Sequence, residues 1–210
     1  MELLKKNKLR GTTMCPEKRI EDLHSILKKT FEKNIEGAFV ECGIWKGGNI
    51  IVAKKFYDSV KDFRQIYGYD TFTGMSPPSK EDGKKAIEKY KNKKNWCLSP
   101  YDEVLENFSN FDIDPKEITL VQGEVEKTLL IEKNLPKKIA VLRLDTDFYS
   151  STKIELEVLY PRLVTGGYLI VDDYGHWEGS RRAVNEYFTE KFVKKNFTVC
   201  DADCIYMEKL

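Results

Sequence analysis

Short apolar runs of strand length alternate along the chain with longer segments whose apolar residues recur at helical spacing. Five runs have the length and composition of strands: Ala38–Ile44, Gln65–Tyr69, Ile118–Val121, Ile139–Leu144 and Gly167–Val171. Helical patterns extend over Ile20–Phe31, Gly47–Ser59, Tyr101–Phe108, Ser151–Arg162 and Gly179–Lys195. Strands separated by helices in this way predict βαβ units, and therefore an α/β fold with a mostly parallel sheet and helices on both of its faces.

Two details refine this expected sheet. The run Ile139–Leu144 opens with apolar residues at successive positions, which is typical of a central strand buried on both faces. After the last helix, Phe197–Cys200 and Ile205–Met207 flank the turn-rich triplet Asp201-Ala202-Asp203. This arrangement predicts a closing antiparallel hairpin, which brings the expected sheet to seven strands.

Composition limits the classes of protein to which the chain can belong. With 210 residues and 41% hydrophobic content, residues 1–210 suffice for one domain. Lys plus Arg number 35 against 34 for Asp plus Glu, so the net charge of +1 gives no general reason to expect nucleic acid or membrane as a partner. No apolar run approaches the roughly 18 residues of a membrane span. The five cysteines are scattered and the first residues lack the apolar stretch of a signal peptide, so we expect reduced thiols and a cytoplasmic protein.

Two segments stand apart from the repeating pattern. The chain starts with a basic stretch without periodicity, and we interpret residues 1–30 as an N-terminal segment or lid. Residues 75–96 begin near Ser76-Pro77-Pro78-Ser79 and become rich in lysine, with seven lysines against three acidic residues in positions 80–95. This second segment is either a lid that attracts an anionic acceptor or the solvated face of a loop. Tyr90 and Trp96 could stack on a sugar ring or anchor the segment to the core.

A glycine-rich turn follows the first expected strand. Its sequence is Glu41-Cys42-Gly43-Ile44-Trp45-Lys46-Gly47-Gly48-Asn49. Glycines there let the backbone turn sharply and approach a ligand, and the N-terminus of the next helix offers free N–H groups. The turn differs from the dinucleotide fingerprint G-x-G-x-x-G, because bulky residues follow Gly43. Glu41 would repel a pyrophosphate but could hold a cationic amine.

An acidic residue ends the second expected strand, 22 residues beyond Gly48. A carboxylate at that place, here Asp70, can accept hydrogen bonds from both hydroxyls of a ribose. A cofactor with a ribose, a cationic amino-acid part and no phosphate is S-adenosylmethionine. The alternative is that the glycines only permit close helix packing and that Asp70 only caps a turn. The occurrence of both features at this spacing favours the cofactor.

Acidic residues also end the fourth and fifth expected strands. Asp145 and Asp147 follow one of them, and Asp172 and Asp173 follow the other. If these two strands are neighbours, about 4.8 Å apart, Asp145, Asp172 and Asp173 can converge where an open parallel sheet binds its ligands. Three carboxylates at one point would repel one another unless a cation neutralised them, and their oxygen donors suit Mg²⁺, with Mn²⁺ or Ca²⁺ as substitutes. We rank Asp147 below Asp145, because the turn can point it elsewhere.

Such a metal would lower the pKa of an acceptor hydroxyl and align its oxygen for attack on the methyl group of the sulfonium. Asp145 or a neighbouring carboxylate would accept the proton. His176 is a second candidate base or ligand, although a single histidine in a loop is more often solvated. For any one acidic residue at a strand end, solvent exposure or helix capping is the simpler explanation, and the presence of three makes a cation site the better one.

The combined motifs resemble the macrocin O-methyltransferase family, whose members methylate sugar hydroxyls of macrolides and of novobiocin. The resemblance rests on Glu41-x-Gly43-x-Trp45-x-Gly47-Gly48, Asp70-Thr71-Phe72-x-Gly74-Met75-x-Pro77-Pro78, Arg143-Leu144-Asp145-x-Asp147-x-Tyr149-x-Ser151-Thr152, Leu159-Tyr160-Pro161 and Gly166-Gly167-Tyr168-x-Ile170-x-Asp172-Asp173-Tyr174. It extends from about Thr12 to the C-terminus. The resemblance implies a class I, Rossmann-like O-methyltransferase that uses S-adenosylmethionine and Mg²⁺ and modifies a small-molecule hydroxyl, expected to belong to a sugar.

The same resemblance implies roles for individual residues. Asp145, Asp172 and Asp173 become the metal ligands, and Asp145 is also the candidate general base. Thr13 and Met14 match a segment that folds over the methionine part of the cofactor, and Gln122 with Gly123 matches the adenosine side. The complete expected cofactor set is Thr13, Met14, Glu41, Gly43, Trp45, Gly47, Asn49, Asp70, Thr71, Phe72, Gln122 and Gly123. A homo-oligomer is compatible with the sequence, which does not identify the acceptor.

Three other interpretations of the acidic motif exist. A metal-dependent glycosyltransferase could use Asp145-x-Asp147 to hold Mn²⁺ on a nucleotide diphosphate. A phosphatase using the same motif would need more chain after it than is present. A scaffold that has lost its chemistry would not be expected to keep Glu41, Asp70 and the carboxylates at the strand ends. Neither alternative enzyme accounts for the glycine turn followed by Asp70.

Overall fold

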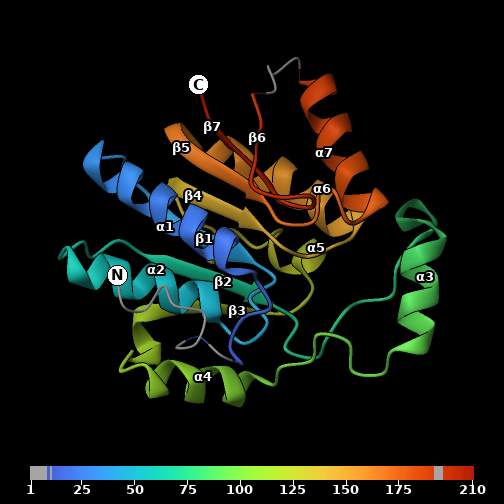
Figure 1. The fold of residues 1–210 in the computed structure, drawn as a ribbon, viewed down its shortest axis with the longest axis horizontal. Coiled ribbons are helices and arrows are strands. Elements are labelled where there is room, and N and C mark those ends of the chain that lie inside the picture. Colours follow the sequence, from blue (N-terminus) through green and yellow to red (C-terminus); the bar gives the residue numbers. More distant parts are fainter. Residues whose placement is uncertain (1–8, 10, 192–195) are drawn as a thin grey trace.

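A computed structural model describes residues 9, 11–191 and 196–210, and it contains a seven-stranded sheet (Figure 1). The strands lie in the order β3-β2-β1-β4-β5-β7-β6. β1 to β5 are parallel, whereas β7 pairs antiparallel with β5 and β6 pairs antiparallel with β7. The strands are β1 Ala38–Cys42, β2 Ile66–Asp70, β3 Ile118–Gln122, β4 Ile139–Leu144, β5 Leu163–Val171, β6 Thr198–Val199 and β7 Ile205–Glu208. This sheet confirms the predicted parallel core and the closing hairpin.

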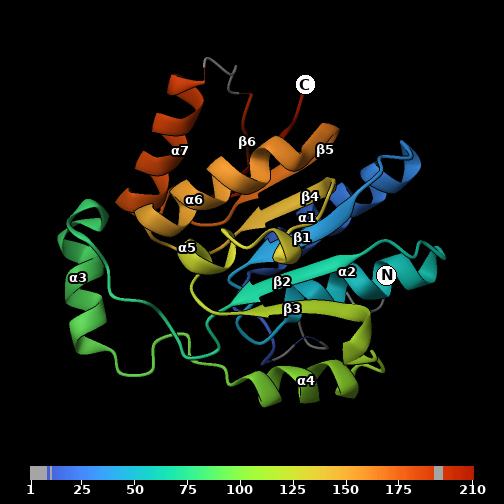
Figure 2. The ribbon, with the colours of Figure 1, turned by 180° about the vertical axis from the view of Figure 1, so that it is seen from behind.

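Helices cover both faces of the sheet, as the alternation of patterns predicts. α1, α2 and α4 lie on the face toward the viewer in Figure 1, and α5, α6 and α7 lie on the face seen in Figure 2. The helices are α1 Glu17–Glu32, α2 Gly48–Ser59, α3 Gly83–Asn92, α4 Tyr101–Asn110, α5 Val125–Thr128, α6 Tyr149–Leu159 and α7 Glu178–Glu190. Short 3-10 turns span Lys80–Asp82, Pro115–Glu117, Glu132–Asn134 and Tyr160–Arg162. Within the described chain, each helix is too short or too polar to cross a bilayer.

The central strands are buried on both faces. All residues of β1 and of β4 are buried, and neighbouring positions of one strand belong to different hydrophobic cores. Phe39 and Val141 pack with the α1 side, whereas Val40 and Leu142 pack with the α6 side. The sheet therefore separates two cores, which is the physical reason for the unbroken apolar run that marks β4 in the sequence.

Several boundaries differ from the sequence-based expectation. β5 begins at Leu163 rather than Gly167, and α6 begins at Tyr149 and ends at Leu159 because Pro161 continues in a 3-10 turn. α7 ends at Glu190, and the expected end at Lys195 falls in residues 192–195, outside the described residues. Much of the expected N-terminal lid, residues 1–8 and 10, also lies outside them.

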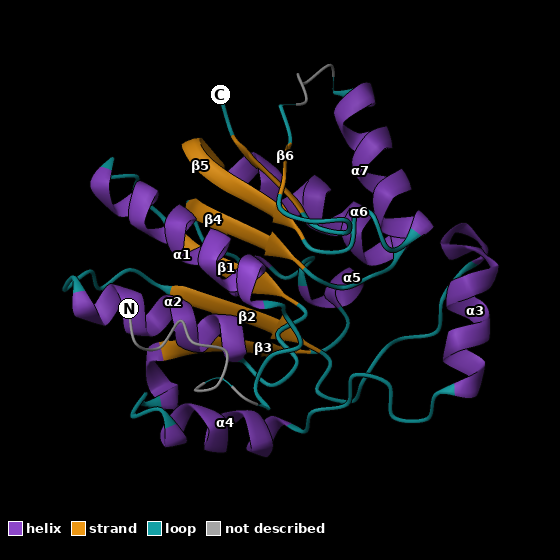
Figure 3. Ribbon diagram, viewed as in Figure 1, coloured by secondary structure: helices purple, strands orange, loops and turns teal. Residues whose placement is uncertain are grey.

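The lysine-rich segment contains an additional helix, α3, which the sequence pattern did not predict. α3 stands beside the sheet and is joined to it by long connections (Figure 3). Its one fully buried residue, Ala86, packs in a third hydrophobic cluster with Trp96, Phe148 and Trp177. A helix that buries so little lacks the apolar periodicity on which prediction depends. The segment is thus a wall docked on the starts of α6 and α7.

Candidate active site

A cavity of about 710 Å³ opens at the carboxyl ends of the parallel strands. This is the crevice in which an open α/β sheet usually binds its ligands, and its volume is in the usual range for small-molecule sites. The glycine turn after β1 and the end of β2 line one part of it. The acidic ends of β4 and β5 and residues of the segment 75–97 line the other. One continuous space therefore joins the two groups of residues singled out in the sequence.

The glycine turn has the backbone that its sequence indicates. Gly43 and Gly47 both have φ of +82°, a left-handed conformation that favours glycine. A Cβ atom on Gly43 would lie 2.0 Å from the carbonyl oxygen of Asp145. The N–H of Gly48 donates to the carbonyl of Thr12 at 3.0 Å, and a Cβ there would lie 2.6 Å from the same oxygen. The turn is thus packed between the carboxylate strand and the segment that precedes α1.

Asp70 lies at the cavity, and its carboxylate organises the loops around it. One oxygen accepts the N–H of Trp45 at 2.9 Å, and the other accepts the N–H of Phe72 at 2.8 Å. Burial raises the pKa of Asp70, although these backbone N–H groups oppose the rise. Asp70 and Thr71 both line the cavity, so Asp70 stays the candidate for the predicted ribose contact.

The structure brings most, but not all, of the expected cofactor residues to the cavity. Eight line it: Thr13, Met14, Gly43, Trp45, Asn49, Asp70, Thr71 and Gly123. Gly47 instead faces Phe108 of α4, because a Cβ on this glycine would lie 2.6 Å from that ring. Phe72 is buried against Tyr101, and the side chain of Gln122 is exposed. The expected cofactor residues are therefore of two kinds. Some face the cavity, and others support its walls.

Glu41 is completely buried and does not line the cavity. Its Oε1 accepts hydrogen bonds from Asn49 at 2.9 Å and from Arg143 at 2.7 Å. Burial raises its pKa, and the Arg143 guanidinium and the Asn49 amide act against that rise. In this structure the carboxylate connects β1, α2 and β4 rather than facing the space where a cofactor amine would lie.

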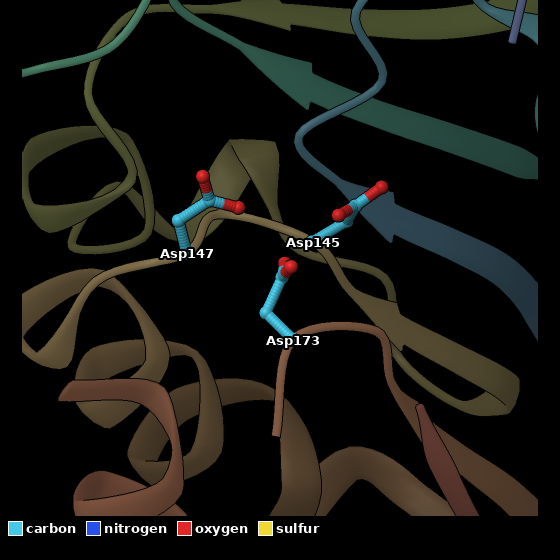
Figure 4. Close-up of side chains that lie close together, drawn as sticks. All are labelled: Asp145, Asp147 and Asp173. Atoms are coloured by element: carbon cyan, nitrogen blue, oxygen red, sulfur yellow. The ribbon is translucent and has the colours of Figure 1, made fainter. Parts of the chain in front are cut away.

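Three carboxylates gather on the opposite side of the cavity (Figure 4). Asp145, Asp147 and Asp173 each offer an oxygen, and these atoms lie within 4.8 Å of one another. Asp147 adopts a left-handed φ of +68°, and its side chain turns toward the other two. Burial raises the pKa values of Asp145 and Asp173 and brings that of Asp147 to about 7. One oxygen of Asp173 is buried without a hydrogen-bond partner in the described chain. The sequence had ranked Asp147 lower, because this turn cannot be deduced from spacing.

Asp172 lies beside this group but makes different contacts. One of its oxygens accepts a hydrogen bond from Arg143, and the other accepts one from Arg19 at 2.5 Å. Successive residues at a strand end point in different directions, which separates Asp172 from Asp173. The sequence analysis grouped Asp172 with Asp145 and Asp173, and the structure brings Asp147 to that position.

Arg143 and Arg19 are site residues that the sequence analysis did not single out as functional. The buried guanidinium of Arg143 donates to Glu41, to Asp172 and, at 2.6 Å, to Asp145. Arg19 at the start of α1 binds Asp172 and Asp201 and lines the cavity. Arg143 could have been identified from the sequence, because it stands in the apolar run Leu142-Arg143-Leu144 and a buried cation in an apolar strand requires nearby carboxylates.

His176 lies at the cavity near its lysine-rich wall. Its Nε2 is 3.3 Å from the Lys85 ammonium and its Nδ1 is 3.7 Å from an oxygen of Asp203. Burial and the Lys85 charge lower its pKa, so the ring is neutral at physiological pH. It stands among the residues of the wall and outside the group of three converging carboxylates.

Comparison with known proteins adds independent evidence. Residues 6–209 match the family described as Macrocin-O-methyltransferase (TylF). The demethyldecarbamoylnovobiocin O-methyltransferase of Streptomyces niveus is 32% identical over 202 residues, covering 94% of this chain and 75% of the relative. An 8-demethyl-8-(2,3-dimethoxy-alpha-L-rhamnosyl)-tetracenomycin-C 4'-O-methyltransferase of Streptomyces olivaceus is 31% identical over 178 residues, covering 83% and 67%. The solved structure of the O-methyltransferase NovP superimposes with a TM-score of 0.87 at 27% identity, covering 99% of this chain and 87% of that one.

Proposed function

The chain belongs to the macrocin O-methyltransferase family, and from this premise we propose that it transfers a methyl group from S-adenosylmethionine to a sugar hydroxyl with the help of Mg²⁺. The observation that carries the proposal is the single cavity that joins the glycine turn and Asp70 to the converging carboxylates. Methyl transfer requires such an arrangement, because the donor and the deprotonated acceptor must meet in one water-excluding space.

The glycine side of the cavity fits S-adenosylmethionine. Asp70 lines the cavity as a carboxylate that can accept hydrogen bonds from ribose hydroxyls, and Gly43 and Trp45 of the left-handed turn line it as well. Met14 lines the cavity although 62% of the residue is exposed, so it is available to cover a bound cofactor. Because Glu41 is paired with Arg143, we assign it the support of this wall and leave the cofactor amine to groups that face the cavity.

The acidic side fits a divalent cation. Carboxylate oxygens are the donors that Mg²⁺ prefers, and the unpartnered buried oxygen of Asp173 is the kind of group that a cation would satisfy. We propose Asp145 and Asp173 as two of the ligands. The third is either Asp147, which already lies beside them, or Asp172, which would first have to break its ion pair with an arginine. When bound, the cation would lower the pKa of an acceptor hydroxyl.

The proton of the acceptor needs a carboxylate that faces the reacting atoms. Asp145 remains our candidate, and Asp147 is the neighbour that shares its orientation. Arg143 holds Asp145 by a 2.6 Å ion pair and so fixes the direction of that carboxylate. The positive sulfonium is already a good leaving group, and the remaining task of the protein is to orient the acceptor and remove its proton.

Sugar acceptors are supported by the activities of the relatives, one of which acts on a rhamnosyl group. The buried rings of Trp96 and Trp177 provide an apolar surface at the cavity on which a sugar face can pack. Family membership separates this proposal from a glycosyltransferase that would use Asp145-x-Asp147. A cytoplasmic location and a homo-oligomer stay predictions.

Calorimetry tests the proposal directly. S-adenosylhomocysteine should bind with one-to-one stoichiometry, whereas UDP-glucose should not compete with it for the glycine side. Methylation of a sugar acceptor, followed by mass spectrometry, should stop in excess EDTA and return when Mg²⁺ is restored. Absence of S-adenosylhomocysteine binding would refute the proposed donor, and full turnover in EDTA would refute the role of the cation.

A further inference from the structure

We infer that the lysine-rich wall selects a negatively charged acceptor, a sugar that carries a phosphate ester, through Lys89 with Lys93 beside it. This inference rests on the proposed function and adds the chemical class of its substrate. The sequence alone left two interpretations of the segment open, an anion-attracting lid and a solvated loop face.

Three lysines form a stripe along α3 that runs past the cavity. Lys85 and Lys89 are four residues apart within α3, which places them on one face of the helix about 6 Å apart along its axis, and Lys93 follows as the residue that ends the helix. Lys89 and Lys93 both line the cavity. Ala86 and Tyr90, next to the stripe, dock the helix on the third hydrophobic cluster. The stripe is therefore fixed against the protein rather than carried by a free loop.

Aromatic rings hold the central ammonium in place. Lys89 Nζ lies 4.3 Å from the ring centroid of Trp96 and 4.7 Å from that of Trp177. Lys85 Nζ lies 5.0 Å from the Trp177 ring and close to His176. A cation over indole rings keeps its donor groups free, because the ring face attracts the charge without accepting a strong hydrogen bond.

The cations of this stripe lack carboxylate partners of their own. Lys80 at the base of the segment is paired with Glu81, whereas Lys85, Lys89 and Lys93 form no ion pair within the described part of the chain. The charge of Lys89 reaches Asp147, so one lysine could serve only to neutralise the acidic group. Neutralisation does not account for Lys93, which lies one turn further along the cavity wall.

The cavity offers the acceptor two kinds of charged group. A hydroxyl to be methylated belongs beside Asp145, Asp147 and Asp173. The phosphate is drawn to Lys89 and Lys93, which line the cavity together with Trp96. A phosphorylated sugar and a sugar linked to a nucleoside diphosphate both present this chemistry.

Binding measurements can isolate the lysine contribution. The protein loaded with S-adenosylhomocysteine, in EDTA, is titrated with methyl rhamnoside, rhamnose 1-phosphate, dTDP-rhamnose and dTDP. Rhamnose is chosen because a relative acts on a rhamnosyl group. We expect the phosphorylated probes to bind and methyl rhamnoside to bind at least about tenfold more weakly. One hydrogen bond to a charged group changes a dissociation constant by about tenfold. Added salt should weaken only the phosphorylated probes.

Matched variants test the assignment to Lys89. K89Q should weaken the phosphorylated probes about tenfold and leave methyl rhamnoside unchanged, K89R should retain most of the affinity, and K93Q should lose less than K89Q. K91Q removes the same charge from the opposite side of α3 and should behave as the parent protein. Tight binding of dTDP alone indicates a nucleotide-linked sugar, and preference for rhamnose 1-phosphate indicates a simple phosphate ester.

The outcomes separate the two proposals. If S-adenosylhomocysteine binds but K89Q and the parent protein do not differ in affinity for any phosphorylated probe, the inference is wrong and the methyltransferase proposal stands. Equal binding of methyl rhamnoside and rhamnose 1-phosphate by the parent protein would also overturn it. Failure of S-adenosylhomocysteine to bind concerns the proposed function alone.

Discussion

Arg143 determines the arrangement of the acidic residues at the scale of single side chains. It is buried near the carboxyl end of β4 and binds Glu41, Asp145 and Asp172. If one member of such a buried group is removed, the charge of its partner stays buried without compensation. In the intact group the guanidinium and the carboxylates are paired. The guanidinium therefore holds Asp145 and Asp172 in different directions and leaves Asp173 free for a cation.

Asp145→Asn and Asp173→Asn should each abolish most of the methyl transfer. We expect kcat to fall by at least about 10²-fold, the usual size of a lost acid–base or charge-stabilising group, because the amide neither accepts the acceptor proton nor balances a cation. Affinity for S-adenosylhomocysteine, measured by calorimetry, should stay within about twofold, since Asp145 and Asp173 follow β4 and β5 whereas the proposed ribose ligand Asp70 ends β2.

Asp102→Asn provides the control for these variants, because Asp102 is an exposed carboxylate on the first turn of α4. It should match the parent protein in both measurements. Retention of more than about half of the parent kcat by the Asp145 variant would exclude that carboxylate from the reaction.

The ionised side chain of Asp201 should contribute to the stability of the protein, and this contribution should be lost in acid. Although partial burial acts in the opposite direction, hydrogen bonds from Arg19 and from the backbone N–H groups of Asp203 and Cys204 lower its pKa to about 2. A pKa below the unfolded value contributes stability above about pH 4 that is lost as the pH falls toward 2. Asp201→Asn should therefore reduce the free energy of unfolding by about 1–2 kcal/mol at pH 7 and by much less at pH 2.5.

Urea unfolding at pH 7, 4 and 2.5 measures this difference. The curves of stability against pH for the parent protein and the Asp201 variant should converge in acid. A constant offset between them at all three pH values would show that Asp201 contributes by packing and not through its charge.

At the scale of the element, α3 depends on a buried carboxylate at its base. Asp82 is 2% exposed, and its oxygens accept the N–H of Tyr149 at the start of α6 and the N–H and hydroxyl of Ser79. A Cβ on Gly179, at the start of α7, would lie 2.0 Å from the same carboxylate. Asp82 thus joins the beginning of the lysine-rich segment to the two helices that frame the acceptor side.

Asp82→Ala should loosen this attachment. We expect the free energy of unfolding to fall by about 1–3 kcal/mol, because the N–H of Tyr149 would lose its partner. Cleavage by trypsin after the lysines of residues 80–95 should become faster, as observed by mass spectrometry of timed digests. Asp102→Ala should change neither quantity, and equal digestion of both variants would show that the cluster around Trp96 suffices to hold α3.

The elements that the sequence predicts well are those that bury a complete face. β1 and β4 are buried along their whole length, and the predicted positions of β1 to β4 agree closely with the structure. α3 and α5 were not anticipated, because one buries a single residue fully and the other has only four residues. The end of α6 moved for a similar reason: proline and capping effects act over one or two residues, below what periodicity can resolve.

For the whole molecule, strand order is the level at which sequence reasoning about the site worked. Acidic residues at the ends of β4 and β5 were expected to meet if these strands are neighbours, and the structure pairs the two strands. Which carboxylates converge could not be expected, since that depends on the left-handed turn at Asp147 and on the arginines that hold Asp172. The near-zero net charge conceals a basic segment and an acidic group that line one cavity.

The separate third hydrophobic cluster has a consequence for how acceptor preference can diversify. Ala86, Trp96, Phe148 and Trp177 pack with one another apart from the two cores that flank the sheet. We therefore expect that exchange of residues 75–97 for the corresponding stretch of a relative would alter the proposed acceptor surface while the two cores that flank the sheet keep their own packing. In this sense the proposed acceptor surface is a module separate from the sheet.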